Sequence, residues 1–260
     1  MKKIFFIITC LLLPVVLLKA QTNNVFEKHW LVQGTDSLPY RLLLPENYDA
    51  TKKYPLVFFM HGAGERGNDN EKQLIHGAKL FLREDTRKNY PAIVVFPQCP
   101  QNSFWSNVSF RADSLGKRSF VFKADVAPTI AMKMANALLH QIIQQYPVQK
   151  KQVYIGGLSM GGMGTFEMVY RNPKLFAAAV PICGGGDPAI AKKVKKTKWW
   201  VFHGAKDDVV PPACSQEMVT ALQAVNANVK FTLYPNANHN SWDAAFAEPG
   251  LLSWLFAQKK

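Results

Sequence analysis

The segment that most constrains the fold is 157–161, Gly-Leu-Ser-Met-Gly, which matches the pattern G-x-S-x-G around Ser159. The β-branched and aromatic residues 152–155 before it are typical of a buried strand, and residues 162–171 after it are typical of a helix that ends before Pro173. A strand, a sharp turn and a helix in this order expose the serine hydroxyl, and the two glycines let strand and helix approach closely. The segment therefore predicts a nucleophilic serine; the alternative is a glycine-rich loop in which the serine is incidental.

A serine hydroxyl needs a base and an acid that orients this base. His239 lies on the loop after the expected strand 229–234, and the other histidines beyond residue 20 do not occupy such a place. An acid is expected just beyond the strand that starts at Trp199, where Asp207 and Asp208 both stand. Nucleophile, acid and base then follow one another along the chain at the ends of three strands. Asp187, after the preceding strand, is a weaker alternative for the acid.

Eight segments have the composition of strands, and long apolar runs such as 55–60 predict central strands that are covered on both faces. The expected strands are 25–33, 40–44, 55–60, 92–97, 152–155, 176–182, 199–202 and 229–234. The first two are expected to pair as an antiparallel ribbon at the sheet edge. Besides the helix at 162–171, we expect a helix over 125–146 capped by Asp125, and one from the loop of His239 to Ala257.

A glycine-rich loop, 61–67, follows the strand 55–60. Its glycines let backbone amides face a substrate oxygen, so we expect one oxyanion donor to be the amide of Ala63 or Gly62. The second expected donor is the amide of Met160, directly after the nucleophile. The alternative is a phosphate-binding loop. Residues 62–67 do fit the spacing G-x-G-x-x-G, but no Lys-Ser/Thr ending follows them, which disfavours this alternative.

Three further segments carry a family resemblance, and they are 38–48, 53–56 and the glycine-rich loop 61–67. Together they resemble the secreted α/β-hydrolases often labelled predicted peptidases. That group is similar to polyhydroxyalkanoate depolymerases, to feruloyl and acetylxylan esterases, and to the phospholipase/carboxylesterase family. The resemblance covers nearly all of the chain beyond residue 20, and its pattern places the orienting acid at Asp207, two residues before a Val-Val pair.

The expected fold is therefore an α/β-hydrolase: a mostly parallel, eight-stranded sheet with helices on both faces. Roughly 15 residues separate the strands 176–182 and 199–202, where cap domains of this family usually insert, so a capless protein with an open site is expected. Residues 101–124 form a longer insertion that could wall the cleft, and Trp105 is expected to line it; the alternative is that Trp105 packs this loop onto the core.

The function that follows is hydrolysis of carboxylic esters through an acyl-enzyme, with Ser159 as nucleophile, His239 as base and Asp207 as its orienting acid. The open site suits bulky or polymer-borne esters. A serine peptidase similar to prolyl oligopeptidase is the alternative, and a non-catalytic secreted binding protein is the third. The acyl and alcohol groups of the substrate stay open. No cofactor is implied, and no metal, since ligand spacings such as H-E-x-x-H are missing.

The N-terminus has the pattern of a signal peptide, with two lysines, an apolar run over 4–18 and a plausible cleavage site after Ala20. We therefore expect residues 1–20 to be removed, residues 21–260 to form one catalytic domain, and the protein to be exported to the periplasm or the medium without stable membrane insertion. A retained anchor is the alternative. The net charge of the chain is +13, but its basic residues are scattered and lack the aromatic interleaving of nucleic-acid binders, so no nucleic-acid partner is expected.

Three cysteines lie beyond residue 20: Cys99, Cys183 and Cys214. An odd number in an exported protein allows at most one internal disulfide and leaves at least one free thiol. The pairing stays open, as does the oligomeric state.

Overall fold

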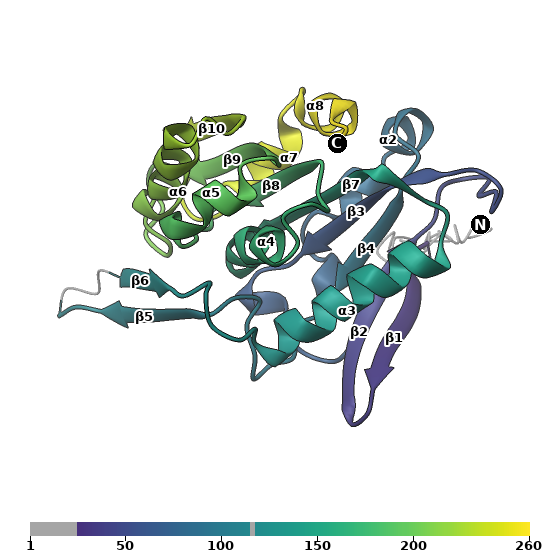
Figure 1. The fold of residues 1–260 in the computed structure, drawn as a ribbon, viewed down its shortest axis with the longest axis horizontal. Coiled ribbons are helices and arrows are strands. Elements are labelled where there is room, and N and C mark those ends of the chain that lie inside the picture. The colour runs from purple at the N-terminus through teal and green to yellow at the C-terminus, as the bar shows by residue number, and fades with distance from the viewer. Residues whose placement is uncertain (1–24, 115–117) are drawn as a thin grey trace, which may run out of the picture.

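The structure, a computed structural model, describes residues 25–114 and 118–260, so the expected signal peptide lies outside the described residues. Within these residues, eight strands form one sheet in the order β1-β2-β4-β3-β7-β8-β9-β10 (Figure 1). Its strands are β1 (Glu27–Gln33), β2 (Asp36–Leu43), β3 (Tyr54–Met60), β4 (Ile93–Pro97), β7 (Val148–Leu158), β8 (Ala178–Ile182), β9 (Lys198–Gly204) and β10 (Val229–Tyr234). The pairs β1–β2 and β2–β4 are antiparallel and the rest are parallel, which confirms the predicted α/β-hydrolase sheet and its antiparallel edge ribbon.

Helices cover both faces of this sheet (Figure 1). They are α1 (Ala78–Leu82), α2 (Glu84–Asn89), α3 (Ile130–Gln145), α4 (Met160–Arg171), α5 (Ala191–Val194), α6 (Ala213–Ala224), α7 (Trp242–Ala247) and α8 (Leu251–Ala257), with short 3-10 turns η1 (Ala63–Glu65), η2 (Lys72–Leu74) and η3 (Pro188–Ile190). Only η3 and α5 lie between β8 and β9, so the described chain has no cap domain at this point, as expected.

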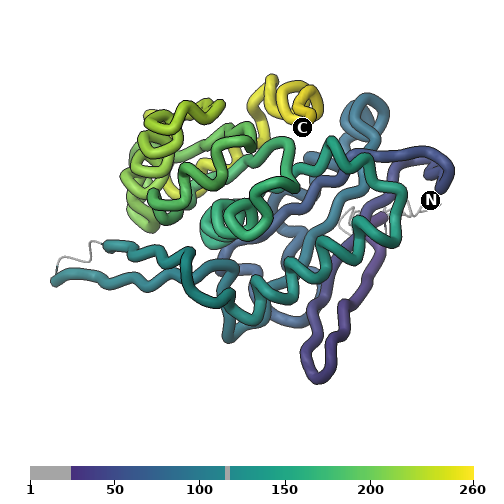
Figure 2. The backbone as a smooth tube through the Cα atoms, viewed as in Figure 1, coloured from purple at the N-terminus to yellow at the C-terminus, as the bar shows by residue number. Residues whose placement is uncertain are grey.

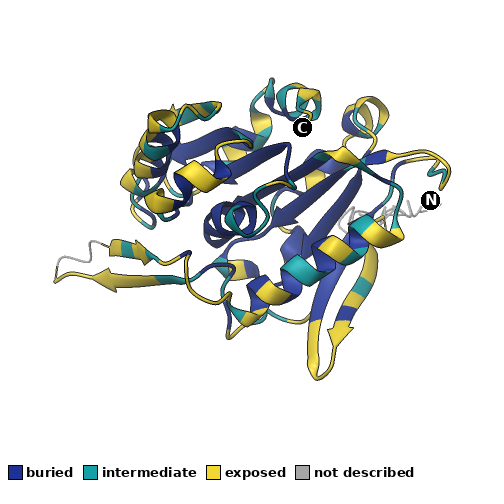
Figure 3. Ribbon diagram, viewed as in Figure 1, coloured by how far each residue is buried: buried dark blue, intermediate teal, exposed yellow. Residues whose placement is uncertain are grey.

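The core consists of two apolar layers, one on each face of the sheet. Successive residues of β3 alternate between them: Phe58 and Met60 face the layer under α3, α4 and α6, while Val57 and Phe59 face the layer under α1, α7 and α8. Figure 3 shows the central strands buried over most of their length and the outer helix faces exposed. This two-sided burial explains why the central strands are continuous apolar runs in the sequence.

Two helix predictions need correction. The helix expected over 125–146 begins only at Ile130, because Pro128 disfavours helical backbone in the residue before it. Its cap is Thr129, whose Oγ1 accepts a hydrogen bond from the Met132 amide at 3.1 Å, and not Asp125. The C-terminal helix is divided into α7 and α8, with Pro249 and Gly250 between them.

The insertion 101–124 contains a hairpin of β5 (Val108–Ala112) and β6 (Arg118–Phe122), which the sequence analysis did not predict. The hairpin projects from the body of the molecule (Figure 2). At its base, the Phe122 ring lies against Gly185 in the segment after β8, since a Cβ added at Gly185 would stand 2.9 Å from the Phe122 Cζ. The insertion is therefore attached at the carboxyl edge of the sheet.

Candidate active site

Ser159 stands on the turn between β7 and α4 with a positive φ of 54° and a ψ of −118°. An ordinary residue adopts positive φ only where its surroundings enforce it. Here the turn is tight because glycines allow the elements to touch: a Cβ added at Gly157 would lie 2.4 Å from the Gly161 carbonyl oxygen. The turn thus has the strained strand–helix geometry that the G-x-S-x-G segment predicts.

The structure brings the three predicted catalytic residues together. His239 Nε2 lies 2.9 Å from Ser159 Oγ, and His239 Nδ1 lies 2.8 Å from Asp207 Oδ2. Each residue follows the carboxyl end of a parallel strand: Ser159 follows β7, Asp207 follows β9 and His239 follows β10. Because these ends meet at one edge of the sheet, side chains up to 80 residues apart in sequence form one hydrogen-bonded row.

The Asp207 side chain is fully buried and forms four short contacts to potential donors. Its Oδ1 accepts hydrogen bonds from the amides of Val209 and Val210, both at 2.9 Å. Its Oδ2 faces His239 Nδ1 at 2.8 Å and His203 Nε2 at 3.1 Å. Burial alone raises the pKa of Asp207, but the hydrogen bonds from the two histidines and from Val210 outweigh it and hold the pKa well below its usual range. Asp208, the alternative acid, is exposed, and its amide donates to Asn238 Oδ1 at 3.2 Å.

The sequence does not predict the part of His203 in this group, since it lies within a strand and not on a loop after one, as His239 does. It is fully buried in β9, four residues before Asp207. Its place near the carboxyl end of β9, four residues before a candidate acid, was the available signal.

The predicted oxyanion donors both begin a helical turn beside the nucleophile. Met160 is the first residue of α4, and Ala63 is the first residue of η1. Amides at the start of a helix have no intrahelical acceptor and remain free to bind an oxygen. The loop of Gly62 lies against the nucleophile, because a Cβ added at Gly62 would stand 3.6 Å from the Ser159 Cβ.

Glu65 is a second residue that the sequence analysis did not single out. The same added Cβ at Gly62 would stand 3.0 Å from Glu65 Oε2, so this carboxylate shares the space beside Gly62 with the nucleophile. The Glu65 side chain is 12% exposed, and its Oε1 lies 3.8 Å from His76 Nε2. Its position in the glycine-rich loop was the available signal.

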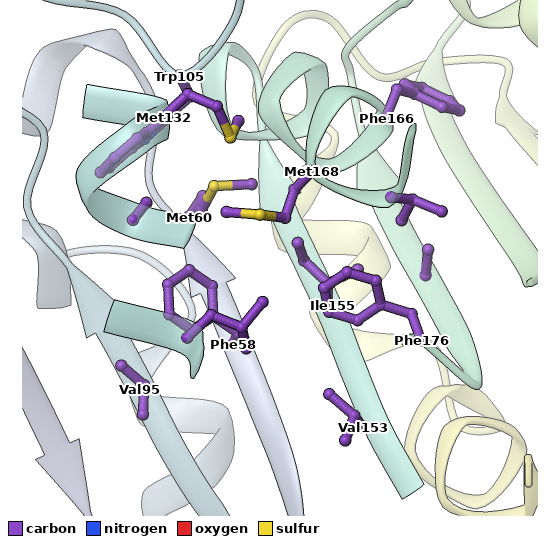
Figure 4. Close-up of a cluster of buried hydrophobic side chains, with 14 of the residues drawn as sticks. Phe58, Met60, Val95, Trp105, Met132, Val153, Ile155, Phe166, Met168 and Phe176 are labelled. Atoms are coloured by element: carbon purple, nitrogen blue, oxygen red, sulfur yellow. The ribbon is translucent and has the colours of Figure 1, made fainter. Parts of the chain in front are cut away.

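The prediction that Trp105 lines the cleft is wrong. Its side chain is 0% exposed, and its indole nitrogen donates to the His61 carbonyl oxygen at 3.1 Å. A Cβ added at Gly164 would lie 2.5 Å from the Trp105 Cβ, so the Trp105 side chain packs directly against the backbone of α4. Figure 4 shows it among the buried side chains of Met60 and Met132. Trp105 therefore packs the insertion onto the core, because the indole finds its hydrogen-bond acceptor there.

Cys99, Cys183 and Cys214 are all free thiols in the structure. Among the described residues, Cys183, Asp207 and His239 form a group whose possible metal-ligand atoms lie within 4.8 Å of one another. Burial raises the pKa of the Cys183 thiol, and the negative charge of Asp207 raises it further. A metal requires the thiolate, and Asp207 and His239 are already hydrogen-bonded to each other, so this donor set does not fit a metal centre.

The sheet order, the strained serine turn and the Ser159–His239–Asp207 row define a protein of the α/β-hydrolase class. The chain belongs to the Phospholipase/Carboxylesterase family, whose model matches residues 48–248. In described residues, no helix has the length and apolar character that a membrane crossing requires.

A solved structure of a thermostable esterase is 33% identical and superposes with a TM-score of 0.81, over 91% of this chain and 64% of that one. Probable feruloyl esterase C of Aspergillus oryzae is 24% identical over 195 residues, which are 74% of this chain and 64% of that protein. Endo-1,4-beta-xylanase Y of Acetivibrio thermocellus is 24% identical over 83% of this chain and only 21% of its own length. The chain thus spans less than two thirds of each of these relatives.

Proposed function

We propose that this chain is a serine esterase that cleaves carboxylic esters through an acyl-enzyme. The observation that carries the proposal is the row of two hydrogen bonds, 2.9 Å from Ser159 Oγ to His239 Nε2 and 2.8 Å from His239 Nδ1 to Asp207 Oδ2. The family of the chain and its likeness to a thermostable esterase support the same chemistry.

In the first step, the Ser159 hydroxyl attacks the ester carbonyl while its proton passes to His239 Nε2. Asp207 accepts the hydrogen bond from Nδ1–H, which fixes the tautomer of His239 and stabilises its charged form. The amides of Met160 and Ala63, or of Gly62 in place of Ala63, hold the oxyanion, and each such donor contributes about 3 kcal/mol to lowering the barrier.

The imidazolium of His239 then protonates the leaving alcohol. Water attacks the acyl-enzyme by the same route, with His239 again accepting a proton and Ser159 as the leaving group. His239 is 18% exposed, so water reaches this side of the site without the opening of a lid.

The substrate class that we propose is an ester carried on a bulky or polymeric alcohol. The absence of a cap between β8 and β9 in the described chain leaves the carboxyl edge of the sheet accessible. Relatives named as a feruloyl esterase and as an acetylxylan esterase/xylanase support plant-polymer esters as the first class to test. Export by the signal-peptide pattern of residues 1–20 fits such a substrate, and N-terminal sequencing of the protein from the medium or periplasm tests it.

The test of the mechanism compares Ser159→Ala with Ser253→Ala, which removes an exposed hydroxyl on α8. Hydrolysis of p-nitrophenyl acetate by Ser159→Ala should fall by at least about 10³-fold while the melting temperature stays close to that of the wild type. Ser253→Ala should keep full activity. Undiminished turnover by Ser159→Ala would remove the assigned nucleophile.

A substrate panel separates the esterase from the peptidase alternative. Feruloyl, acetyl-sugar and short aliphatic esters should be cleaved with a kcat/KM far above that for peptide amides carrying the same acyl groups. A higher kcat/KM for the amides would contradict the esterase assignment and favour the peptidase.

A further inference from the structure

His203 is buried against the acid of the proposed catalytic row, and its two ring nitrogens both have short contacts. Nε2 lies 3.1 Å from Asp207 Oδ2 and 2.9 Å from the Val210 carbonyl oxygen. Nδ1 lies 2.7 Å from Ser215 Oγ, and this hydroxyl lies 2.9 Å from the Gly184 carbonyl oxygen. Both partners of Nε2 are acceptors only, so Nε2 must carry a hydrogen.

The protons available to this chain of contacts can be counted. It has three links: Nε2 to its acceptors, Nδ1 to Ser215 Oγ, and Ser215 Oγ to the Gly184 carbonyl. A neutral imidazole and one hydroxyl supply two protons, which leaves two electron pairs facing each other at either the 2.7 Å or the 2.9 Å contact. An imidazolium supplies the third proton, and every link then has one donor and one acceptor.

The electrostatic surroundings agree with this count. The carboxylate of Asp207 is fully buried, and a buried anion is costly unless a positive charge lies beside it. Among the described residues, the other titratable side chains that interact with Asp207 include His239 from the loop after β10, Cys183 from the end of β8 and Cys214 from α6. Burial raises the pKa of both thiols, to about 11 for Cys214, so neither adds negative charge near neutral pH.

We propose that His203 is a buried imidazolium and the positioning residue of the catalytic acid. It orients the carboxylate of Asp207 through Oδ2 and offsets its charge, so that His239 faces an ion pair and not an isolated anion. This inference rests on the proposed function, because the charge of Asp207 matters for turnover only if His239 is the base. Its consequence is that His239 remains unprotonated, and the enzyme active, at lower pH than an isolated aspartate would allow.

The first test reads the proton directly and needs no turnover. Long-range ¹H–¹⁵N correlation spectra of the labelled full chain at pH 7 should show one buried imidazole with hydrogens on both nitrogens, and this signal should be lost in His203→Gln. A wild-type His203 with one unprotonated nitrogen at pH 7 would overturn the proposal. If Ser159→Ala kept its activity, the proposed function would fail, but the spectrum of His203 would not change. The failure of the proposed function and the failure of this inference are therefore distinguishable.

The second test is the pH profile of kcat/KM. Glutamine at position 203 keeps a donor toward Asp207 but removes the positive charge, so the acid limb should move to higher pH by about one to two pH units. Ser215→Ala removes the acceptor of Nδ1–H and should move the limb in the same direction by less. His140→Gln is the matched control, since His140 is an exposed histidine that contacts Asn172, and its limb should not move.

A purely structural role for His203 predicts a different result. The variants would then lose stability or kcat while the acid limb coincided with that of the wild type, and this outcome would overturn the proposal. Should His203→Gln fail to fold, Ser215→Ala and the wild-type spectrum still decide the matter.

Discussion

Gly161 lies so close to the Met60 carbonyl that a Cβ added to it would stand 2.0 Å from the oxygen. Real Cβ atoms do not approach oxygen to this distance, and the obstacle is strand backbone and not a flexible side chain. The first turn of α4 is therefore seated directly on the end of β3, and this contact sets the position of Ser159 relative to the glycine-rich loop.

We expect Gly161→Ala to lower the free energy of unfolding by about 3 kcal/mol or more, because the backbone of α4 or β3 must shift. Urea unfolding measures this. The matched control is Gly64→Ala, whose added Cβ meets nothing within 4 Å and whose effect should stay within about 0.5 kcal/mol. Equal stability of Gly161→Ala and the wild type would show that the contact yields easily.

Burial lowers the pKa of His61 to about 4, although its hydrogen bond to the Gly62 carbonyl favours the charged form. The ring is held neutral because it is buried and because Nε2 accepts a hydrogen bond from the Cys99 amide at 2.9 Å, which leaves Nδ1–H to donate to the Gly62 carbonyl oxygen at 2.6 Å. An unfolded chain takes up this proton near pH 6.5, well above the folded protein. The stabilisation is therefore complete above that pH and is lost as the pH falls toward 4.

The expected loss from His61 alone is about 3 kcal/mol between pH 7 and pH 4. Chemical unfolding of the wild type and of His61→Gln across this range measures it, because other acid-titrating groups affect both proteins alike. The difference in unfolding free energy between the two should shrink by about this amount at the acid end. Curves that remain parallel would contradict the assignment.

Trp105 should affect stability and not substrate affinity, since it is buried. Trp105→Ala should cost about 3–5 kcal/mol, and Trp105→Phe about 1–2 kcal/mol, because the His61 carbonyl loses its donor. The KM of Trp105→Phe should match that of the wild type. Trp30→Phe, at a site 51% exposed on β1, is the control and should change stability by less than about 0.5 kcal/mol. A raised KM with unchanged stability would restore Trp105 to the cleft.

The carboxylate of Glu65 beside the nucleophile should disfavour esters whose acyl group carries a negative charge. Glu65→Gln should raise kcat/KM for a p-nitrophenyl hemisuccinate relative to p-nitrophenyl acetate by roughly fivefold to tenfold, which corresponds to about 1 kcal/mol of repulsion removed. Glu84→Gln is the charge-matched control. Glu84 is exposed on α2, which precedes the amino end of β4, whereas the proposed site lies at the carboxyl ends of the strands. An unchanged ratio of the two substrates in Glu65→Gln would show that the carboxylate does not reach the acyl group.

The strands, the serine turn and the three residues of the proposed catalytic row could be predicted from local patterns in the sequence. The burial of β3 and β4 can be predicted from their apolar runs, and the tight turn at Ser159 can be predicted from the glycines around it. Both features depend on residues that are neighbours in the chain. The helix start expected at Asp125 is wrong because the apolar spacing continues across Pro128, although Pro128 disfavours helical backbone in the residue before it.

Tertiary structure alone decided how side chains distant in sequence share one point. His203 could be placed on a strand end from the sequence, but its hold on the same Asp207 oxygen as His239 depends on where α6 and two loops meet. Trp105 is likewise buried because its indole nitrogen donates to the carbonyl oxygen of His61, which lies in the core and 44 residues earlier in the chain. Periodicity and motif spacing describe what a segment can do next to its neighbours, whereas a buried polar group is placed by whichever partner the folded chain brings within hydrogen-bond distance.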